Sequence, residues 1–257
     1  MQVNHRVEGA KDGPAVVLHT SLGCALRMWD PQIRALTAAG FRVVRYDYRG
    51  HGSSLPAPGP YTLDDLGTDV LELMDSLGIA EAAHVGLSLG GMVAMWLAER
   101  THARVTGLVL CATSAALAPA SAWSERAAKV RAAGSTTEIA DAFLPRWLGA
   151  EFSVAHPDTV KWVRDQILET SPEGFAGGCE AIAGMDLLSG LDRIDVPTAV
   201  VVGKQDPGTP PEHSELIAAT IPGATLSLVD PGAHLVNVEQ PEPVSGAILG
   251  LLTRIAP

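Results

Sequence analysis

Two rhythms of apolar residues alternate along the chain. Short β-branched runs are followed by longer stretches in which apolar residues recur every three or four positions. The short runs predict strands, and the longer stretches predict helices. The predicted strands are Ala15–His19, Arg42–Tyr46, Ala83–Leu87, Val105–Cys111, Thr198–Gly203 and Thr225–Val229. Because strands and helices alternate, we predict an α/β fold with a mostly parallel central sheet and helices on both faces.

Capping residues mark the predicted helices. Trp29–Ala39 is entered through Asp30-Pro31 and closed by Gly40. In Thr62–Leu77, Thr62 is the expected N-cap, with Asp65 three residues on. The remaining helices outside the insertion described next are predicted at Gly90–Arg100, at Pro211–Thr220 and from about Glu239.

Residues 119–190 interrupt this alternation. The segment is rich in alanine and helical in pattern, and it contains no convincing strand. We therefore predict a single domain over residues 1–257, with a helical cap insertion at about 119–190. A cap on a parallel sheet creates a cleft in which a ligand can bind.

The central motif is Gly86-Leu87-Ser88-Leu89-Gly90-Gly91, which lies between a predicted strand and a predicted helix. In that setting, G-x-S-x-G is typical of a sharp turn that exposes a nucleophilic serine. Gly86 and Gly90 meet the demand for tiny neighbours, and Gly91 lets the helix approach the sheet. We predict Ser88 as the nucleophile. A glycine-rich turn with a capping serine is the alternative.

A serine nucleophile needs an imidazole base and a carboxylate that orients it, in the chain order Ser, acid, His in this fold. Only His234 follows the last predicted strand, and Asp206 is the only carboxylate in the loop after Thr198–Gly203. We predict these two residues as base and acid. Other candidates after Ser88 are less well placed: His102, His156, His213, Asp186, Asp195 and Asp230.

The oxyanion of an acyl-transfer intermediate needs two preset donors. We predict the backbone N–H of Leu89, directly after the nucleophile, and that of Leu22 in the loop after the first strand, with Ser21 as the fallback. His19 is interpreted as a residue that holds this loop, and Asp47 as a turn residue that organises the loop after it.

Composition excludes several function classes. Apolar residues make up 47% and charged residues 18%, which is typical of a folded globular chain. The net charge is -11 and no Lys/Arg run is present, so nucleic-acid binding is not expected. No apolar run reaches the roughly 20 residues of a membrane span, and the N-terminus lacks the core of a signal peptide. Three widely spaced cysteines suggest no metal or redox motif and favour a reduced, cytoplasmic setting.

The chain resembles the 3-oxoadipate enol-lactonases, a group within the α/β-hydrolases. The elbow motif identifies only the α/β-hydrolase superfamily. Matches in the insertion are more specific for the enol-lactonase group, because the cap shapes the substrate pocket. The similar stretches include Ser21-Leu22-Gly23, Leu26-Arg27-Met28-Trp29-Asp30, Arg49-Gly50-His51-Gly52, Leu144-Pro145-Arg146-Trp147, Pro172-Glu173-Gly174-Phe175 and Asn237-Val238-Glu239-Gln240-Pro241.

The resemblance implies hydrolysis of a small, carboxylate-bearing enol-lactone through an acyl-enzyme, without a metal or organic cofactor. It places the protein in the bacterial breakdown of aromatic compounds. This chain differs from the family pattern at Cys24-Ala25, Tyr48 and Ala112, near loops that can line the pocket.

An acidic substrate in a chain of net charge -11 needs a local cation, and arginine suits a carboxylate. Trp123 and Arg126 lie three apart on a predicted helix, and Arg146 and Trp147 form a second pair. We predict these four as substrate-binding, although a surface arginine packed along the cap is the commoner arrangement. The partner expected is a small lactone or ester. The alternatives are an esterase or lactonase with another, for example biosynthetic, substrate, a cofactor-free haloperoxidase, and a non-catalytic binding protein of this fold.

Overall fold

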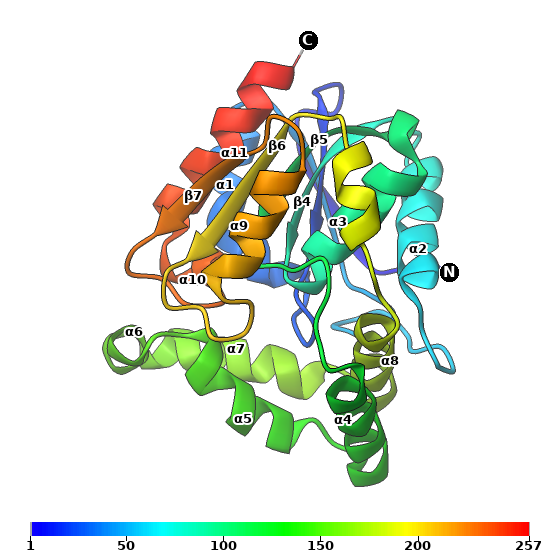
Figure 1. Ribbon diagram of the computed structural model, residues 1–257, viewed down its shortest axis with the longest axis vertical. Helices are drawn as coiled ribbons and strands as arrows, with labels where there is room; N and C mark the ends of the chain where they lie inside the picture. Colours follow the sequence, from blue (N-terminus) through cyan, green and yellow to red (C-terminus); the bar gives the residue numbers. More distant parts are fainter. Residues whose placement is uncertain (1, 257) are drawn as a thin grey trace.

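The computed structural model describes residues 2–256, and within them a seven-stranded sheet forms the centre of the molecule (Figure 1). The strand order is β1-β3-β2-β4-β5-β6-β7. Every neighbouring pair is parallel except β1 and β3, which are antiparallel. The strands are β1 His5–Gly9, β2 Ala15–His19, β3 Arg42–Tyr46, β4 Ala82–Leu87, β5 Val105–Cys111, β6 Thr198–Gly203 and β7 Thr225–Val229. The predicted α/β class is confirmed.

Strand β1 was missed by the sequence pattern. Its sequence, His5-Arg6-Val7-Glu8-Gly9, is mostly polar, and its residues are half-buried or exposed. As an edge strand it pairs with β3 alone. The pairing uses backbone groups, which every residue type has, so it produces no sequence pattern. By contrast, the central strand β4 is buried throughout, and its sequence is a nearly continuous apolar run, which is why it was predicted.

Helices cover both faces of the sheet (Figure 1). One face carries α2, α3 and α9, and the other carries α1 and α11. Alternate residues of β5 enter the two cores: Leu108 and Leu110 face one, and Val109 and Cys111 face the other. The bounds are η1 Leu26–Trp29, α1 Asp30–Ala38, α2 Leu63–Ser76, α3 Leu89–Arg100, η2 His102–Arg104, α9 Pro211–Thr220, α10 Val236–Glu239 and α11 Pro241–Ile255.

Five helices occupy the chain between β5 and β6 among the described residues, and we term them the cap helices. They lie together below the lower edge of the sheet in Figure 1. They are α4 Ala120–Ala133, α5 Thr137–Trp147, α6 Ala150–Ala155, α7 Pro157–Glu169 and α8 Pro172–Ala183, followed by η3 Leu188–Arg193. All five fall inside the segment predicted as an insertion. Among residues 2–256, no helix has both the length and the apolar character needed to cross a membrane.

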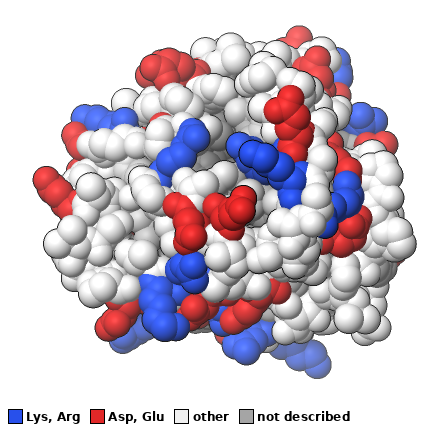
Figure 2. Space-filling view, turned by 90° about the horizontal axis from the view of Figure 1, so that it is seen from below, with Lys and Arg blue, Asp and Glu red and all other residues white. Residues whose placement is uncertain are grey.

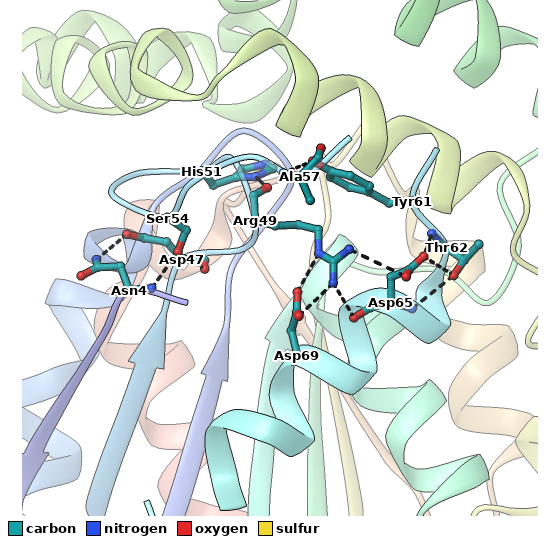
Figure 3. A network of polar contacts seen from close by, with 10 residues as sticks. All are labelled: Asn4, Asp47, Arg49, His51, Ser54, Ala57, Tyr61, Thr62, Asp65 and Asp69. Atoms are coloured by element: carbon teal, nitrogen blue, oxygen red, sulfur yellow. Dashed lines mark hydrogen bonds and ion pairs between the residues drawn. The ribbon is translucent and has the colours of Figure 1, made fainter. Parts of the chain in front are cut away.

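The loop after β3 is organised around Asp47 (Figure 3). Its carboxylate accepts hydrogen bonds from Leu26 N–H at 2.6 Å, Ser53 N–H at 3.0 Å and Asn4 Nδ2 at 2.7 Å. These three donors come from separate segments, so the loop is fixed around the Asp47 carboxylate. The interpretation of Asp47 as a turn residue is therefore confirmed.

The same loop supports the cap. The Arg49 guanidinium binds the Asp69 carboxylate at 2.7 and 2.8 Å, which fixes the loop on α2 (Figure 3). Gly50 meets Gly174 of α8 so closely that an added Cβ would lie 2.5 Å from the Gly174 Cα. Ser171 N–H donates to Gly50 O at 2.8 Å. Backbone-to-backbone contact of this kind requires glycine on both sides.

We predict that Gly86→Ala destabilises the fold. A Cβ at this position would lie 2.2 Å from the Gly90 backbone, which cannot yield as a flexible side chain can. The free energy of unfolding should fall by about 2–3 kcal/mol, as measured by urea denaturation. The matched control is Gly246→Ala in α11, where a Cβ meets nothing within 4 Å. That variant should gain about 0.5–1 kcal/mol from the helix propensity of alanine. Equal stability of the two variants would contradict the steric argument.

Candidate active site

Ser88 occupies a strained turn between β4 and α3. Its φ is 56° and its ψ is -117°, a conformation that non-glycine residues rarely adopt. The turn is sterically possible because the neighbouring residues Gly90 and Gly91 have no side chains. A Cβ on Gly90 would lie 2.3 Å from His19 O, and one on Gly91 would lie 2.7 Å from the Thr113 side chain. This is the geometry of a nucleophile elbow.

Hydrogen bonds from the end of β5 hold the strained turn in place. Ser88 N–H donates to Cys111 O at 2.9 Å, and Thr113 Oγ1 donates to Ser88 O at 2.7 Å. Both backbone groups of Ser88 are therefore paired inside the protein. Its side chain borders a cavity, and 8% of the residue is exposed.

His234 and Asp206 form a buried pair at the carboxyl edge of the sheet. His234 Nδ1 lies 2.8 Å from Asp206 Oδ2. The carboxylate also accepts from Gly208 N–H at 2.7 Å, Thr209 N–H at 3.1 Å and Thr209 Oγ1 at 2.8 Å. In the neutral imidazole, Nδ1–H donates to the acid, which leaves Nε2 as an acceptor.

The surroundings of Asp206 lower its pKa. Burial by itself raises the pKa, but the charge of His234 and the hydrogen bonds from His234 and Thr209 outweigh it, so the pKa lies below the ordinary value. The carboxyl is therefore ionised at neutral pH. An ionised acid next to a histidine can orient the ring and stabilise the imidazolium.

Ser88 and His234 line the same small cavity, of about 80 Å³, which lies between the sheet edge and the cap helices. Asp206 lies behind His234, where it contacts the imidazole. The other lining residues are Ser21, Leu22, Leu117, Trp123, Arg126, Phe143, Arg146, Trp147, Ile182, Gly208 and Thr209. Sequence reasoning missed Phe143 and Thr209. Phe143 lies three residues before Arg146 on α5, a spacing that could have revealed it.

Two backbone donors are available beside Ser88. The N–H groups of Leu22 and Leu89 have no hydrogen-bond partner in the described part of the chain. Leu89 is the first residue of α3, where backbone N–H groups are left free for a negative charge. The fallback donor is less suitable, because Ser21 N–H contacts Met28 Sδ at 3.2 Å.

His19 lies in the core beside this loop. Its Nδ1 is 2.8 Å from Tyr46 Oη, and its Nε2 is 2.9 Å from His84 Nδ1. Burial first, and His84 second, lower the pKa of His19 well below the ordinary value. A neutral histidine with both ring nitrogens engaged holds the start of the loop, as the sequence suggested.

A second serine–histidine contact lies outside the cavity. Ser114 Oγ is 2.6 Å from His213 Nδ1, and it also donates to Ala116 O at 2.6 Å. The Ser114 hydroxyl proton is donated to Ala116 O, so His213 Nδ1–H must donate to Ser114 Oγ. His213 therefore cannot take a proton from Ser114 and does not activate it. Ser114 is 2% exposed, so this pair is a structural link between the loop after β5 and α9.

The four predicted substrate-binding residues all border the cavity. The Arg126 Cζ lies 4.4 Å from the ring centroid of Trp123 and 5.0 Å from that of Phe143. Arg146 Nη2 donates to Pro207 O at 2.8 Å. Within residues 2–256, neither guanidinium forms an ion pair with a carboxylate. Two arginines without acidic partners make this wall of the cavity suited to an anionic group.

The two arginines also line a neighbouring hollow. Arg126, Phe143 and Arg146 border a second hollow, of about 730 Å³, between α4 and α5. Seen from below, the molecule shows basic and acidic side chains mixed, with no field of one sign (Figure 2). The cationic side chains that border the cavity are Arg126 and Arg146. In the described residues, no cluster of three or more His, Cys, Asp or Glu side chains is placed to hold a metal ion.

Comparison with known proteins defines the class. The family model described as "alpha/beta hydrolase fold" matches residues 14–241. The chain is 36% identical to 3-oxoadipate enol-lactonase 2 of Acinetobacter baylyi, over 98% of this chain and 93% of that protein. The chain therefore belongs to the alpha/beta-hydrolase family and, within it, to the group of the 3-oxoadipate enol-lactonases. It is a hydrolase that acts on ester bonds.

Solved structures agree with this assignment. The enol-lactonase from Burkholderia xenovorans LB400 has a TM-score of 0.94 and 39% identity, over 98% of this chain and 96% of that chain. A thermophilic esterase from Thermogutta terrifontis, solved with malate bound, has a TM-score of 0.94 and 32% identity, over 99% and 94% of the two chains. The resemblance read from the sequence is confirmed.

The lowered pKa of Asp206 predicts how stability depends on pH. A carboxyl with a lower pKa in the folded state contributes stability above its unfolded pKa, near 3.9, and this contribution is lost as pH falls through the folded pKa. The wild type should therefore be more stable than Asp206→Asn at neutral pH, and the difference should shrink below about pH 4. Urea unfolding of both proteins from pH 7 to pH 2.5 measures this difference. A gap that stays constant to pH 2.5 would contradict the assignment of the low pKa to Asp206.

Proposed function

We propose that this protein is a serine hydrolase that opens a small, carboxylate-bearing enol-lactone of the 3-oxoadipate enol-lactone type through an acyl-enzyme. The observation that carries the proposal is one cavity lined by a serine in an elbow turn, a histidine paired with a buried aspartate, and two arginines without acidic partners.

Acylation begins with Ser88. His234 Nε2 takes the hydroxyl proton while Ser88 Oγ attacks the lactone carbonyl, and Asp206 stabilises the imidazolium that forms. The backbone N–H groups of Leu22 and Leu89 receive the oxyanion. When the intermediate collapses, the ring C–O bond breaks and His234 returns the proton to the enol oxygen. The product is an acyl ester on Ser88, and its enol end converts to a ketone.

Deacylation repeats the same steps with water. His234 takes a proton from a water molecule, which attacks the acyl carbonyl, and the Ser88 oxygen leaves with the proton from His234. The products are the free oxo-acid and the regenerated serine.

The arginine wall orients the substrate. Arg126 or Arg146 pairs with the carboxylate of the lactone, and Trp123 and Trp147 form apolar sides of the cavity. The malate bound to the Thermogutta esterase, itself a dicarboxylate, supports an acid as the ligand of this kind of hydrolase.

The second candidate is an ester or another lactone as substrate. It is favoured by the similarity to that esterase, and by Tyr48, Ala112 and Cys24, where this chain departs from the enol-lactonase pattern. The triad chemistry is the same, so substrate comparison separates the two.

We predict that Ser88→Ala abolishes turnover. Without the nucleophile, kcat for the 3-oxoadipate enol-lactone should fall by at least about 10⁴-fold, measured by ultraviolet absorbance. The matched control is Ser114→Ala, which removes the other serine that contacts a histidine and should keep kcat within about 3-fold, because Ser114 is not activated. A neutral p-nitrophenyl ester is assayed in parallel. Ser88-dependent turnover of the ester alone would favour the second candidate.

We predict that Arg126→Met weakens binding of acidic substrates selectively. Loss of one charge-assisted contact should raise KM for the lactone by about 10- to 100-fold, whereas KM for the neutral ester stays within about 3-fold. Lys129→Met is the control, since Lys129 is an exposed cation on the same helix and its loss changes net charge equally. Equal changes in KM for both substrates would contradict the carboxylate role.

A further inference from the structure

Three segments meet around His234, and side chains connect each pair. We term them the acid loop (residues 204–209), the histidine loop (residues 230–235) and the cap turn (residues 146–149). Gln205 joins the first two: its N–H donates to Gly232 O at 2.9 Å, and its Oε1 accepts from Gly232 N–H at 2.7 Å. Arg146 joins the cap turn to the acid loop through Pro207 O.

Glu239 closes this ring between the cap turn and the histidine loop. Its Oε1 accepts the N–H of Gly149, and its Oε2 accepts the N–H of Ala233. A parallel backbone bond runs from Leu235 N–H to Trp147 O at 2.9 Å. The residues on both sides of His234, Ala233 and Leu235, are therefore hydrogen-bonded directly or through Glu239 to the end of α5.

The arrangement is specific to a carboxylate. Glu239 is 7% exposed, and a buried carboxylate is stable only when its oxygens receive hydrogen bonds. An N–H group on each oxygen satisfies that demand from two segments far apart in the sequence. Glu239 does not border the cavity of Ser88 and His234, so it does not touch a substrate there.

We propose that Glu239 is a positioning residue: its carboxylate bridges the cap turn and the histidine loop, and so holds His234 in line with Ser88. This inference rests on the proposed base role of His234. The orientation of a base is sensitive, because a misplacement of about 1 Å from a distant mutation can lower a rate about 100-fold. In Glu239→Gln the amide keeps one acceptor oxygen and presents an N–H₂ group to the other backbone N–H, so one side of the bridge is lost.

The test uses a fluorophosphonate, which needs no knowledge of the substrate. Ser88 Oγ bonds to phosphorus, fluoride leaves, and His234 takes the serine proton, so the second-order labelling rate reports the alignment of this pair. Glu239→Gln is compared with Glu242→Gln, an exposed glutamate three residues on whose replacement makes the same change of charge. Near-ultraviolet circular dichroism and the unfolding midpoint report folding.

We expect Glu239→Gln to fold and to label about 10- to 100-fold more slowly than wild type, with KM for the neutral ester within about 3-fold. Glu242→Gln should label within about 2-fold of wild type.

A wild-type labelling rate in Glu239→Gln, with only a lower unfolding midpoint or a smaller folded fraction, would overturn the positioning role. An unfolded Glu239→Gln protein would overturn it too, because Glu239 would then serve the fold. Absence of Ser88 labelling in the wild type would instead refute the proposed triad itself.

Discussion

The left-handed turn at Ser88 is the constraint on which the site depends. Its φ of 56° is tolerated only where α3 packs tightly against the backbone at the end of β2 and against the Thr113 side chain after β5. Gly86, Gly90 and Gly91 remove the atoms that would prevent that approach. The same contact brings the loop after His19 next to the N-terminus of α3. The predicted nucleophile and the predicted oxyanion donors therefore depend on the same close packing.

The cap helices contribute the cationic side chains that border the cavity. The strands and loops contribute Ser88, Asp206 and His234, none of which distinguishes an acid from a neutral ester. Arg126 and Arg146 come from α4 and α5 and lie against aromatic rings and a backbone carbonyl, not against carboxylates. Neither arginine has a carboxylate partner within residues 2–256, which suits this wall of the cavity to an anionic group even in a chain of net charge -11.

Buried polar groups also connect the cap to the chemistry. The buried carboxylates of Asp206 and Glu239 accept backbone N–H groups, Asp206 within the acid loop and Glu239 from the histidine loop and the end of α5. A polar group buried without partners is costly, so these segments are stable mainly in one relative arrangement. The cap helices thus border the pocket and are hydrogen-bonded to the loop that carries His234.

Sequence by itself determined the features that arise from local rules. Apolar runs identified β2 to β7, and the run is clearest where a strand such as β4 is buried on both faces. The glycines around Ser88 marked the elbow, because the turn excludes side chains. Chain order selected Asp206 and His234, and the structure brings these two into contact. Tertiary structure alone decided the rest. The polar strand β1, the orphan N–H of Leu22, the aromatic stacking of Arg126 and the bridge made by Glu239 depend on partners that are distant in the chain. Their hydrogen bonds and ring contacts follow from how the elements pack, which no local pattern records.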